Sequence, residues 1–309
     1  VTLSLNLPVL SSQIWYVDAD APPGGDGRSW EQAVPSLDDA LWYARGGDEI
    51  RVARGVYVPA IPTDPADPRT ASFILRGNLV IRGGYAGRGA PDPDARNLEL
   101  HPSILSGDRV SSGTLPGHAA DNCYHVIAVE PATTATLLEG FIVRDGHADV
   151  SGSYRDTGGG LLTLYQGLNV HHCRFEANYA LLWGGSVYHG KGGLVQFHDC
   201  IFADNQSDYD GGAVFTDASP LQFERCLFIG NHAQRHGGGL DNERSEMTLE
   251  DCEFTSNTSG LRGGAIYTYG KNPMTHANCR FENNHTLYDG GAVMNHYTDA
   301  VYTDCEFIG

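Results

Sequence analysis

The sequence has few basic residues and no long apolar run. Its 309 residues include 20 lysines and arginines against 38 aspartates and glutamates, which gives a net charge of −18. This charge makes nucleic acid and an anionic membrane surface unsuitable partners. No apolar run approaches the roughly 20 residues of a membrane-spanning helix, so we expect no membrane insertion in this segment. The acidic balance instead suits solubility outside a cell and the binding of cations.

An initial methionine is also missing, because the chain begins with Val1. A signal peptide has been removed from a secreted protein, or the sequence begins inside a longer chain.

Long helical periodicity is absent from the last third, which repeats one pattern of strand-length pieces. The pattern is C-x-F-x-x-N followed by a Gly-Gly pair, and successive cysteines lie 26 or 27 residues apart. A fixed period of this size is typical of stacked repeats. Ankyrin, tetratricopeptide and leucine-rich units are excluded, since their helices or asparagine frames do not appear. The sequence therefore predicts an all-β fold, a parallel β-helix with about 26 residues per rung.

Stacking of equivalent residues predicts ladders along the coil. The phenylalanines should stack in the lumen and the asparagines should form a hydrogen-bonded ladder at a corner. The glycine pairs should form the next bend. The phenylalanines are Phe175, Phe202, Phe228, Phe254, Phe281 and Phe307, and the asparagines are Asn178, Asn205, Asn231, Asn257 and Asn284.

The repeated cysteines have two interpretations. Parallel strands in register bring neighbouring cysteines within disulfide range. A buried column of free thiols is the favoured alternative, because bridging would distort the rungs and leave an odd thiol among the seven.

The chain divides into an N-terminal extension, residues 1–13, and one β-helix domain, residues 14–309. Within the domain we expect a cap and first rung at 14–59, irregular rungs with long loops at 60–136, and regular repeats at 137–309. Ser36 is the expected N-cap of a short capping helix that ends before Gly46-Gly47. The helix would cover the first rung of the coil.

Self-association is predicted from two features of the chain. Residues 1–10 alternate apolar and polar side chains, as a flanking strand or as a strand exchanged with another molecule. The sequence stops at Gly309 within a rung, so an open C-terminal end would favour end-to-end stacking into a fibre. A longer natural chain is the alternative explanation.

Several segments resemble known β-helix proteins. Trp15-Tyr16-Val17-Asp18, Gly47-Asp48-Glu49-Ile50 and Gly83-Gly84-Tyr85 resemble the N-terminal part of secreted bacterial β-helix proteins of the pectate-lyase-like superfamily. The F-x-x-N and Gly-Gly-Ala-Ile repeats, as in Phe254 to Asn257 and Gly263 to Ile266, are similar to those of the chlamydial polymorphic outer-membrane proteins. The resemblance implies a right-handed coil and a secreted or cell-surface bacterial protein. It does not imply one function, because lyases, hydrolases, adhesins and phage spikes share this architecture.

The column immediately before each glycine pair is the candidate catalytic site, because it varies while its surroundings repeat. Its titratable members are Asp210, His236, Arg262 and Asp289. In a β-elimination on a uronic acid polymer, His236 or Arg262 would abstract the proton and the aspartates would act as acid or metal ligands. The alternative is a row of exposed ion pairs beside a bend.

A second candidate face follows each glycine pair. If the aliphatic residues point inward, alternation turns the next side chains outward as an exposed platform for sugar rings. The candidate ligand-binding residues are Tyr188, Phe215, Asp217, Asp241, Glu243, Tyr267 and His296. The alternative is reversed parity, which would place the aromatic rings in the core.

An acidic loop near the N-terminus is a candidate calcium site. Asp18, Asp20 and Asp26 offer carboxylate oxygens, although their spacing is not that of an EF-hand. The alternative is a solvated turn. Calcium is the one cofactor that the sequence suggests.

The sequence lacks the motifs of enzymes that share the fold. It has neither an Arg-x-Pro-x-x-Arg lyase signature nor the Asn-x-Asp, Asp-Asp, His-Gly and Arg-Ile-Lys set of polygalacturonases. We therefore expect a structural, adhesive or carbohydrate-binding surface protein. A polysaccharide lyase or glycoside hydrolase acting on an acidic polysaccharide in a groove along the coil is the alternative.

Overall fold

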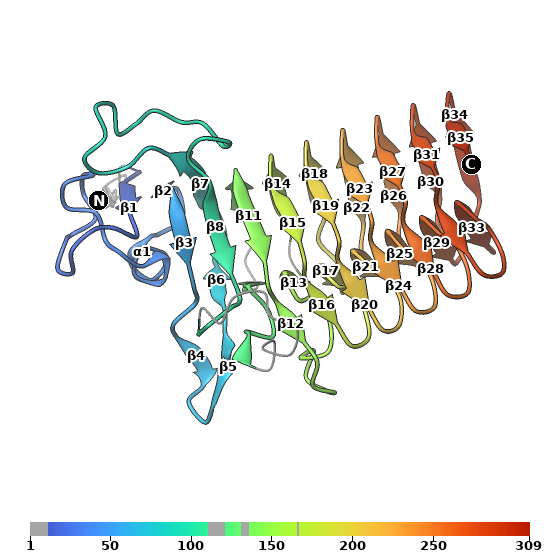
Figure 1. The fold of residues 1–309 in the computed structure, drawn as a ribbon, viewed down its shortest axis with the longest axis horizontal. Helices are drawn as coiled ribbons and strands as arrows, with labels where there is room; N and C mark the ends of the chain where they lie inside the picture. Colours follow the sequence, from blue (N-terminus) through green and yellow to red (C-terminus); the bar gives the residue numbers. More distant parts are fainter. Residues whose placement is uncertain (1–11, 111–120, 131–135, 166) are drawn as a thin grey trace, which may run out of the picture.

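The structure is a computed structural model, and it describes residues 12–110, 121–130, 136–165 and 167–309. The described strands wind into a parallel β-helix, with successive rungs stacked along the long axis (Figure 1). This confirms the predicted fold class. Residues 1–10, for which a flanking or exchanged strand was predicted, lie outside the described residues.

Parallel sheets run the length of the coil, and each rung gives one strand to each sheet in the regular part. The first sheet contains β1 (Ile14–Val17), β2 (Glu49–Ala53), β7 (Val80–Tyr85), β10 (Thr136–Glu139), β14 (Leu168–His171), β18 (Val195–His198), β22 (Leu221–Glu224), β26 (Met247–Glu250), β30 (Met274–Ala277) and β34 (Ala300–Thr303). The second contains β3 (Gly55–Tyr57), β8 (Ser103–Ser106), β11 (Phe141–Arg144), β15 (Arg174–Glu176), β19 (Ile201–Ala203), β23 (Leu227–Ile229), β27 (Glu253–Thr255), β31 (Arg280–Glu282) and β35 (Glu306–Ile308).

A third sheet and a short corner sheet complete the rungs. The third sheet contains β6 (Phe73–Leu75), β9 (Ile127–Val129), β13 (Leu161–Leu164), β17 (Val187–Gly190), β21 (Val214–Asp217), β25 (Leu240–Glu243), β29 (Ile266–Tyr269) and β33 (Val293–His296). The corner sheet contains β12 (His147–Ala148), β16 (Tyr179–Ala180), β20 (Gln206–Ser207), β24 (His232–Ala233), β28 (Thr258–Ser259) and β32 (His285–Thr286). An antiparallel hairpin of β4 (Pro62–Asp64) and β5 (Asp67–Ala71) projects from the coil (Figure 1).

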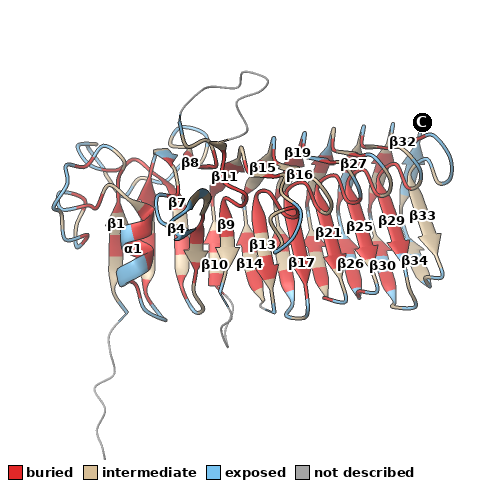
Figure 2. Ribbon diagram, turned by 90° about the horizontal axis from the view of Figure 1, so that it is seen from below, coloured by how far each residue is buried: buried red, intermediate tan, exposed pale blue. Residues whose placement is uncertain are grey.

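The predicted phenylalanine ladder fills the lumen. Phe202, Phe228 and Phe254 stack with ring centroids 4.6 Å and 4.4 Å apart and nearly parallel planes. Phe197 and Phe223 form a second stack, 5.1 Å apart, on the neighbouring sheet. The buried residues form a band along the coil (Figure 2). Burial of their apolar side chains is the main stabilising contribution to the stack of rungs.

The asparagine ladder and the glycine bends are also as predicted. Asn205 Nδ2 donates to Asn231 Oδ1 at 3.0 Å, and Asn231 Nδ2 donates to Asn257 Oδ1 at 2.9 Å. The first glycine of each pair has a positive φ, for example +61° at Gly237. A Cβ there would overlap the carbonyl of Leu240, so the bend requires glycine.

All seven cysteines are free thiols, which confirms the favoured interpretation over disulfides. Each repeated cysteine contacts main-chain carbonyls, as Cys200 Sγ does with Val170 O at 3.4 Å and His198 O at 3.3 Å. Burial raises the pKa of the Cys173 thiol to about 12. The column therefore behaves as small hydrophobic side chains.

The predicted capping helix is present as α1 (Leu37–Tyr43). Ser36 Oγ accepts a hydrogen bond from the backbone N–H of Asp38 at 3.1 Å, as expected of an N-cap. Leu37 and Leu41 are buried against the first strands, so α1 closes the N-terminal end of the core (Figure 2). Within the described part of the chain, no helix has the length and apolar character needed to cross a bilayer.

Candidate functional site

The variable column before the glycine pairs is continuous, as predicted, and is called the file below; its members are Trp183, Asp210, His236, Arg262 and Asp289. Successive parallel bridges join Trp183 to Asp210, Asp210 to His236, His236 to Arg262 and Arg262 to Asp289. The file lies at the bend that leads from the corner sheet into the third sheet. The glycine pair follows each member along the chain, and a third-sheet strand begins soon after it.

The four titratable members of the file form two pairs. Asp210 Oδ1 lies 3.2 Å from His236 Nδ1 and also accepts the backbone N–H of His236 at 3.1 Å. Arg262 Nε lies 3.4 Å from Asp289 Oδ2, and both of these side chains are well exposed. The exposed ion-pair interpretation thus describes Arg262 and Asp289. It does not describe Asp210, whose residue is only 4% exposed.

The expected platform of exposed aromatic rings is not present. Tyr188, Phe215 and Tyr267 are 5%, 3% and 4% exposed, so the prediction that they are exposed was wrong. Their parity was right, because the aliphatic residues before them point into the lumen and are fully buried. The rings are covered from outside by the file itself: Trp183 stacks on Phe215 at 5.5 Å and His236 on Tyr267 at 4.3 Å.

Asp241 interrupts this covered aromatic row. It pairs in register with Phe215 on one side and Tyr267 on the other, so a carboxylate stands where neighbouring rungs have a ring. Asp241 is 0% exposed, and neither of its carboxylate oxygens has a hydrogen-bond partner. Burial, with the nearby charges of Asp210 and Glu243, raises the pKa of Asp241 well above its usual value. The expectation that Asp241 faces solvent was therefore wrong.

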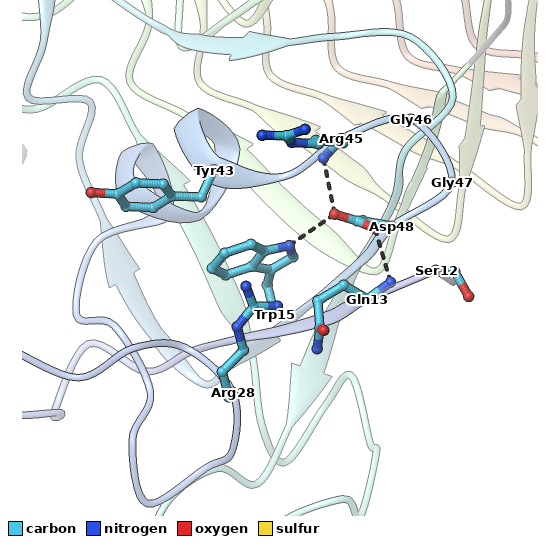
Figure 3. Close-up of a pocket in the computed structure, with 9 residues that line it drawn as sticks. All are labelled: Ser12, Gln13, Trp15, Arg28, Tyr43, Arg45, Gly46, Gly47 and Asp48. Atoms are coloured by element: carbon cyan, nitrogen blue, oxygen red, sulfur yellow. Dashed lines mark hydrogen bonds between the residues drawn. The ribbon is translucent and has the colours of Figure 1, made fainter. Parts of the chain in front are cut away.

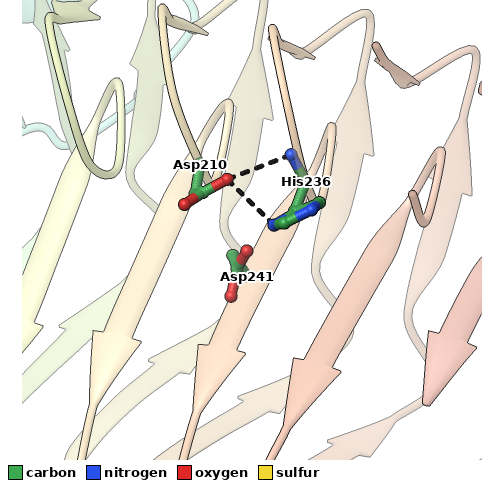
Figure 4. Close-up of side chains that lie close together, drawn as sticks. All are labelled: Asp210, His236 and Asp241. Carbon is green, nitrogen blue, oxygen red and sulfur yellow. Dashed lines mark hydrogen bonds and ion pairs between the residues drawn. The ribbon is translucent and has the colours of Figure 1, made fainter. Parts of the chain in front are cut away.

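Asp241 lies beneath Asp210 and His236 (Figure 4). One potential ligand atom from each of the three lies within 4.8 Å of the others. Among the described residues, no other group of three or more histidine, cysteine or acidic side chains lies this close together. In the sequence, Asp210 and His236 belong to one column and Asp241 belongs to another. The sequence feature that could have indicated this site is Asp241 itself, an acidic residue at a position where neighbouring repeats have an aromatic ring.

The remaining predicted ligand-binding residues lie further along the third-sheet strands. Asp217 Oδ1 accepts from Arg244 Nη2 at 2.5 Å, and Glu243 Oε2 lies 4.0 Å from the same nitrogen. His296 Nδ1 lies 3.1 Å from the Tyr267 hydroxyl. Asp217 and Glu243 therefore share one arginine at the surface, and Arg244 lies closer to Asp217.

A surface depression of about 390 Å³ opens beside the file. Residues from three successive bends line it, two from each: Arg235, His236, Leu261, Arg262, Tyr288 and Asp289. The Arg235 guanidinium lies over the Tyr209 ring, 3.8 Å from its centroid. Three of these residues were not predicted from the sequence, although each directly precedes a member of the file: Arg235, Leu261 and Tyr288.

The candidate calcium loop does not gather its carboxylates. Asp18 accepts the backbone N–H groups of Asp20 at 3.0 Å and Arg88 at 2.7 Å, and Asp26 accepts that of Arg28 at 2.9 Å. The bonds to Asp20 and Arg28 join residues two apart and stabilise turns, so the turn interpretation describes the loop. Asp18 is buried rather than solvated, since it ties the loop to Arg88. The prediction of a calcium site at Asp18, Asp20 and Asp26 is not supported.

A second pocket, of about 500 Å³, lies at the capped end near α1 (Figure 3). Its acidic residue, Asp48, accepts from the Trp15 indole at 3.0 Å and from the backbone of Gln13 and Arg45. Burial opposes ionisation, but these hydrogen bonds outweigh it and lower the pKa of Asp48. Asp48 is thus fully engaged in holding the cap together.

Comparisons with known proteins confirm the resemblance stated above. The family model of the Chlamydia polymorphic membrane protein repeat matches residues 199–217 and 251–269. Each stretch spans one copy of the repeat, from its cysteine to the strand after its glycine pair. A comparison with curated protein sequences finds no match.

Similar solved structures are parallel β-helix proteins. A rhamnogalacturonan lyase has 14% identity and a TM-score of 0.54, over 90% of this chain and 73% of that chain. Pectate lyase Pel9A has 14% identity and a TM-score of 0.49, over 94% and 79%. Pectin methylesterase PemA from Erwinia chrysanthemi has 9% identity and a TM-score of 0.49, over 94% and 90%. At 14% identity, the similarity to the rhamnogalacturonan lyase shows a shared fold and nothing about function.

Proposed function

We propose that this protein is a secreted or cell-surface β-helix protein that binds an acidic carbohydrate in the depression between Arg235 and Asp289. The surface location is supported by the match to the polymorphic membrane protein repeat. The carbohydrate role rests on the make-up of the depression, whose lining contains two arginines, one histidine and apolar surface beside a single acidic residue, Asp289. An adhesive or structural role outside the cell follows from such binding.

The depression offers the two contacts that an acidic sugar needs. Arg235, His236 and Arg262 place positive or protonatable groups on adjacent rungs, in a protein whose net charge is −18. Arginine binds carboxylates through parallel N–H donors. Tyr288 and Leu261 are 71% and 36% exposed and offer apolar faces to a sugar ring. The rungs repeat at about 4.8 Å, so an extended polymer can contact several in succession.

Binding to a glycan array, followed by titration with oligomers of uronic acids and with glycosaminoglycans, tests the proposal. We expect the Arg262→Ala variant to bind an acidic oligosaccharide at least about tenfold more weakly, a loss of about 1.4 kcal/mol. Arg280→Ala is the matched control. The Arg262 and Arg280 side chains are 40% and 41% exposed, and each pairs with a carboxylate one rung further on.

Three results would contradict the proposal. They are failure to bind any acidic glycan, equal binding of neutral glycans, and equal loss of affinity in Arg262→Ala and Arg280→Ala. The last result would mean that only the overall charge matters.

A polysaccharide lyase or glycoside hydrolase is the second candidate. It is favoured by His236, a possible base that lines the depression beside Arg262. It is opposed by the burial of Asp210 and Asp241, because an acid or base must reach the polymer. Incubation with pectin, alginate and glycosaminoglycans distinguishes the two functions. Catalysis would release reducing ends or unsaturated uronates, whereas binding alone would release neither.

Self-association remains part of the proposal, with residues 1–10 as the predicted contact. Light scattering of the full chain and of a variant without residues 1–10 tests it. Assembly should increase with protein concentration and be lost on deletion. A monomer at all concentrations would remove this part of the proposal without affecting glycan binding.

A further inference from the structure

The buried carboxylate of Asp241 has no partner that explains its presence. Both oxygens are enclosed and neither is hydrogen-bonded. Burying a carboxylate in this way is unfavourable unless the group is neutralised or coordinates a cation. The fold itself does not require an acid there, because Phe215 and Tyr267 occupy the same position on the adjacent rungs. Asp241 therefore has a role other than packing.

We propose that Asp210, His236 and Asp241 form a binding site for a divalent first-row transition-metal ion, with Zn²⁺ as the representative. The carboxylate of Asp241 lies beneath the other two side chains (Figure 4), and the three candidate ligand atoms lie within 4.8 Å of one another. One imidazole and two carboxylates suit zinc or manganese better than calcium, which takes oxygen ligands.

The distances suit a small ion. Asp210 Oδ1 and His236 Nδ1 are 3.2 Å apart. Two ligands of a tetrahedral zinc ion, each about 2.0–2.2 Å from the metal, are separated by roughly 3.3–3.6 Å. The pair therefore needs little movement to share an ion, and the Asp241 carboxylate is the nearby group that would complete the set.

The protein also holds two of the ligands in place. The His236 ring stacks on Tyr267 with centroids 4.3 Å apart and planes 18° apart. The backbone N–H of His236 donates to Asp210 Oδ1, which fixes that carboxylate to the next bend. Ligands fixed by their surroundings bind a metal with less loss of conformational entropy.

The charges around the site leave room for a cation. Asp210 and Asp241 are acidic, and the Arg235 guanidinium lies near them, with Nε 3.9 Å from Asp210 Oδ1. The nearby Glu243 adds a third carboxylate, which shares Arg244 with Asp217. An ion would enter past His236, whose side chain is 12% exposed and lines the surface depression. The site therefore lies beneath the proposed glycan surface but does not depend on glycan binding.

Metal analysis of the tag-free full chain tests this inference. After dialysis against ZnCl₂ and removal of free metal, we expect one zinc ion per chain by mass spectrometry and a higher Tm than for the metal-free protein. Asp241→Asn and His236→Gln should lose the ion and the zinc-dependent rise in Tm. Asp289→Asn is the matched control, since it changes an exposed carboxylate of the same file and should keep both.

Two further measurements keep the test decisive. Asp241→Phe copies the residue of the preceding rung, so it should fold, gain thermal stability without metal and bind no zinc. Replacement of zinc by Co²⁺ should give a spectrum without a thiolate charge-transfer band, because no cysteine belongs to the site. A thiolate band would assign the metal to the cysteine column and overturn the inference. So would a wild-type protein that takes up no zinc or manganese, or an Asp241→Asn variant that retains the ion.

Discussion

The side-chain amide of Asn205 and its own backbone N–H both donate to one atom, Oδ1 of Asn231 on the next rung, each at 3.0 Å. Asn231 in turn donates from Nδ2 to the carbonyl of Phe202 at 2.9 Å. Each asparagine therefore supplies hydrogen bonds to a buried corner where the chain leaves strand geometry. The ladder joins adjacent rungs as directly as the sheets do.

Replacement of Asn231 by alanine should lower the free energy of unfolding by about 3 kcal/mol. The change leaves the buried backbone N–H of Asn205 without an acceptor, and it removes one of the two hydrogen bonds of the Asn205 side-chain amide, which keeps its bond to the Phe175 carbonyl. A buried donor without an acceptor costs about 1–3 kcal/mol, and a lost hydrogen bond costs about 1 kcal/mol. Urea denaturation measures the effect. Asn169→Ala, on the outward face of β14, is the control and should stay within about 0.5 kcal/mol of the wild type. Equal effects at the two positions would show that the ladder contributes nothing specific.

Truncation of the luminal Phe228 should be among the most destabilising single changes. Phe228 is fully buried between Phe202 and Phe254, so its removal leaves a cavity in the stack. We expect Phe228→Ala to cost about 3–5 kcal/mol in chemical denaturation. The adjacent Ile229 is 37% exposed on the opposite face, and Ile229→Ala should cost about 0.5 kcal/mol. A small loss at Phe228 would mean that the rungs collapse to fill the gap.

The first glycine of a bend should not tolerate a side chain. Gly237 has φ of +61°, and a Cβ there would overlap the Leu240 carbonyl. Gly192 has φ of +106° with open space where its Cβ would be. Gly192→Ala should therefore lose only about 1–2 kcal/mol for its backbone conformation, whereas Gly237→Ala should lose several times more or fail to fold. Soluble yield and Tm of the two variants provide the comparison.

Acid sensitivity is expected from His276, which is fully buried with neither ring nitrogen hydrogen-bonded. Burial lowers its pKa from 6.5 to about 4. The unfolded chain therefore takes up a proton first as the pH falls. The stability contributed by the neutral ring is complete above about pH 6.5 and is lost as the pH falls to about 4, roughly 3 kcal/mol in all.

His276→Phe should remove this loss, because Phe223 shows that the same luminal row accepts a phenyl ring. Unfolding free energies at pH 7, 5.5 and 4.5 measure the slope for each variant. His285→Phe changes an exposed histidine and should leave the slope as in the wild type. A wild-type slope in His276→Phe would assign the acid sensitivity to other groups, of which the buried His125 and His189 also have their pKa lowered to about 4.

The repeated features were predictable because they depend on residue type and period. The fixed period of 26 or 27 residues indicates stacked rungs, and stacked rungs place Phe228 directly beside Phe254. The same holds for Asn205 with Asn231, since in-register strands place equal residues about 4.8 Å apart. The N-cap of α1 was predictable for a local reason, the hydroxyl of Ser36 two residues before a free backbone N–H.

The covering of the outward row was decided by the tertiary structure. The alternation along a strand determines the face of the sheet from which each side chain projects, and it predicts that Phe215 and Tyr267 project away from the lumen. It does not state what lies over that side. The bend before each glycine pair folds back over the strand that follows, so Trp183 and His236 cover these rings.

The candidate metal site has the same origin. Asp210 comes from one bend, His236 from the next, and Asp241 from the strand after the second bend. The coil, its ladders and the file that contains Asp210 and His236 could be predicted from the sequence, because they follow from a period of 26 or 27 residues. The enclosure of Asp241 beneath that file became visible in the folded chain alone, because the path of a bend depends on packing between rungs and not on the spacing within one.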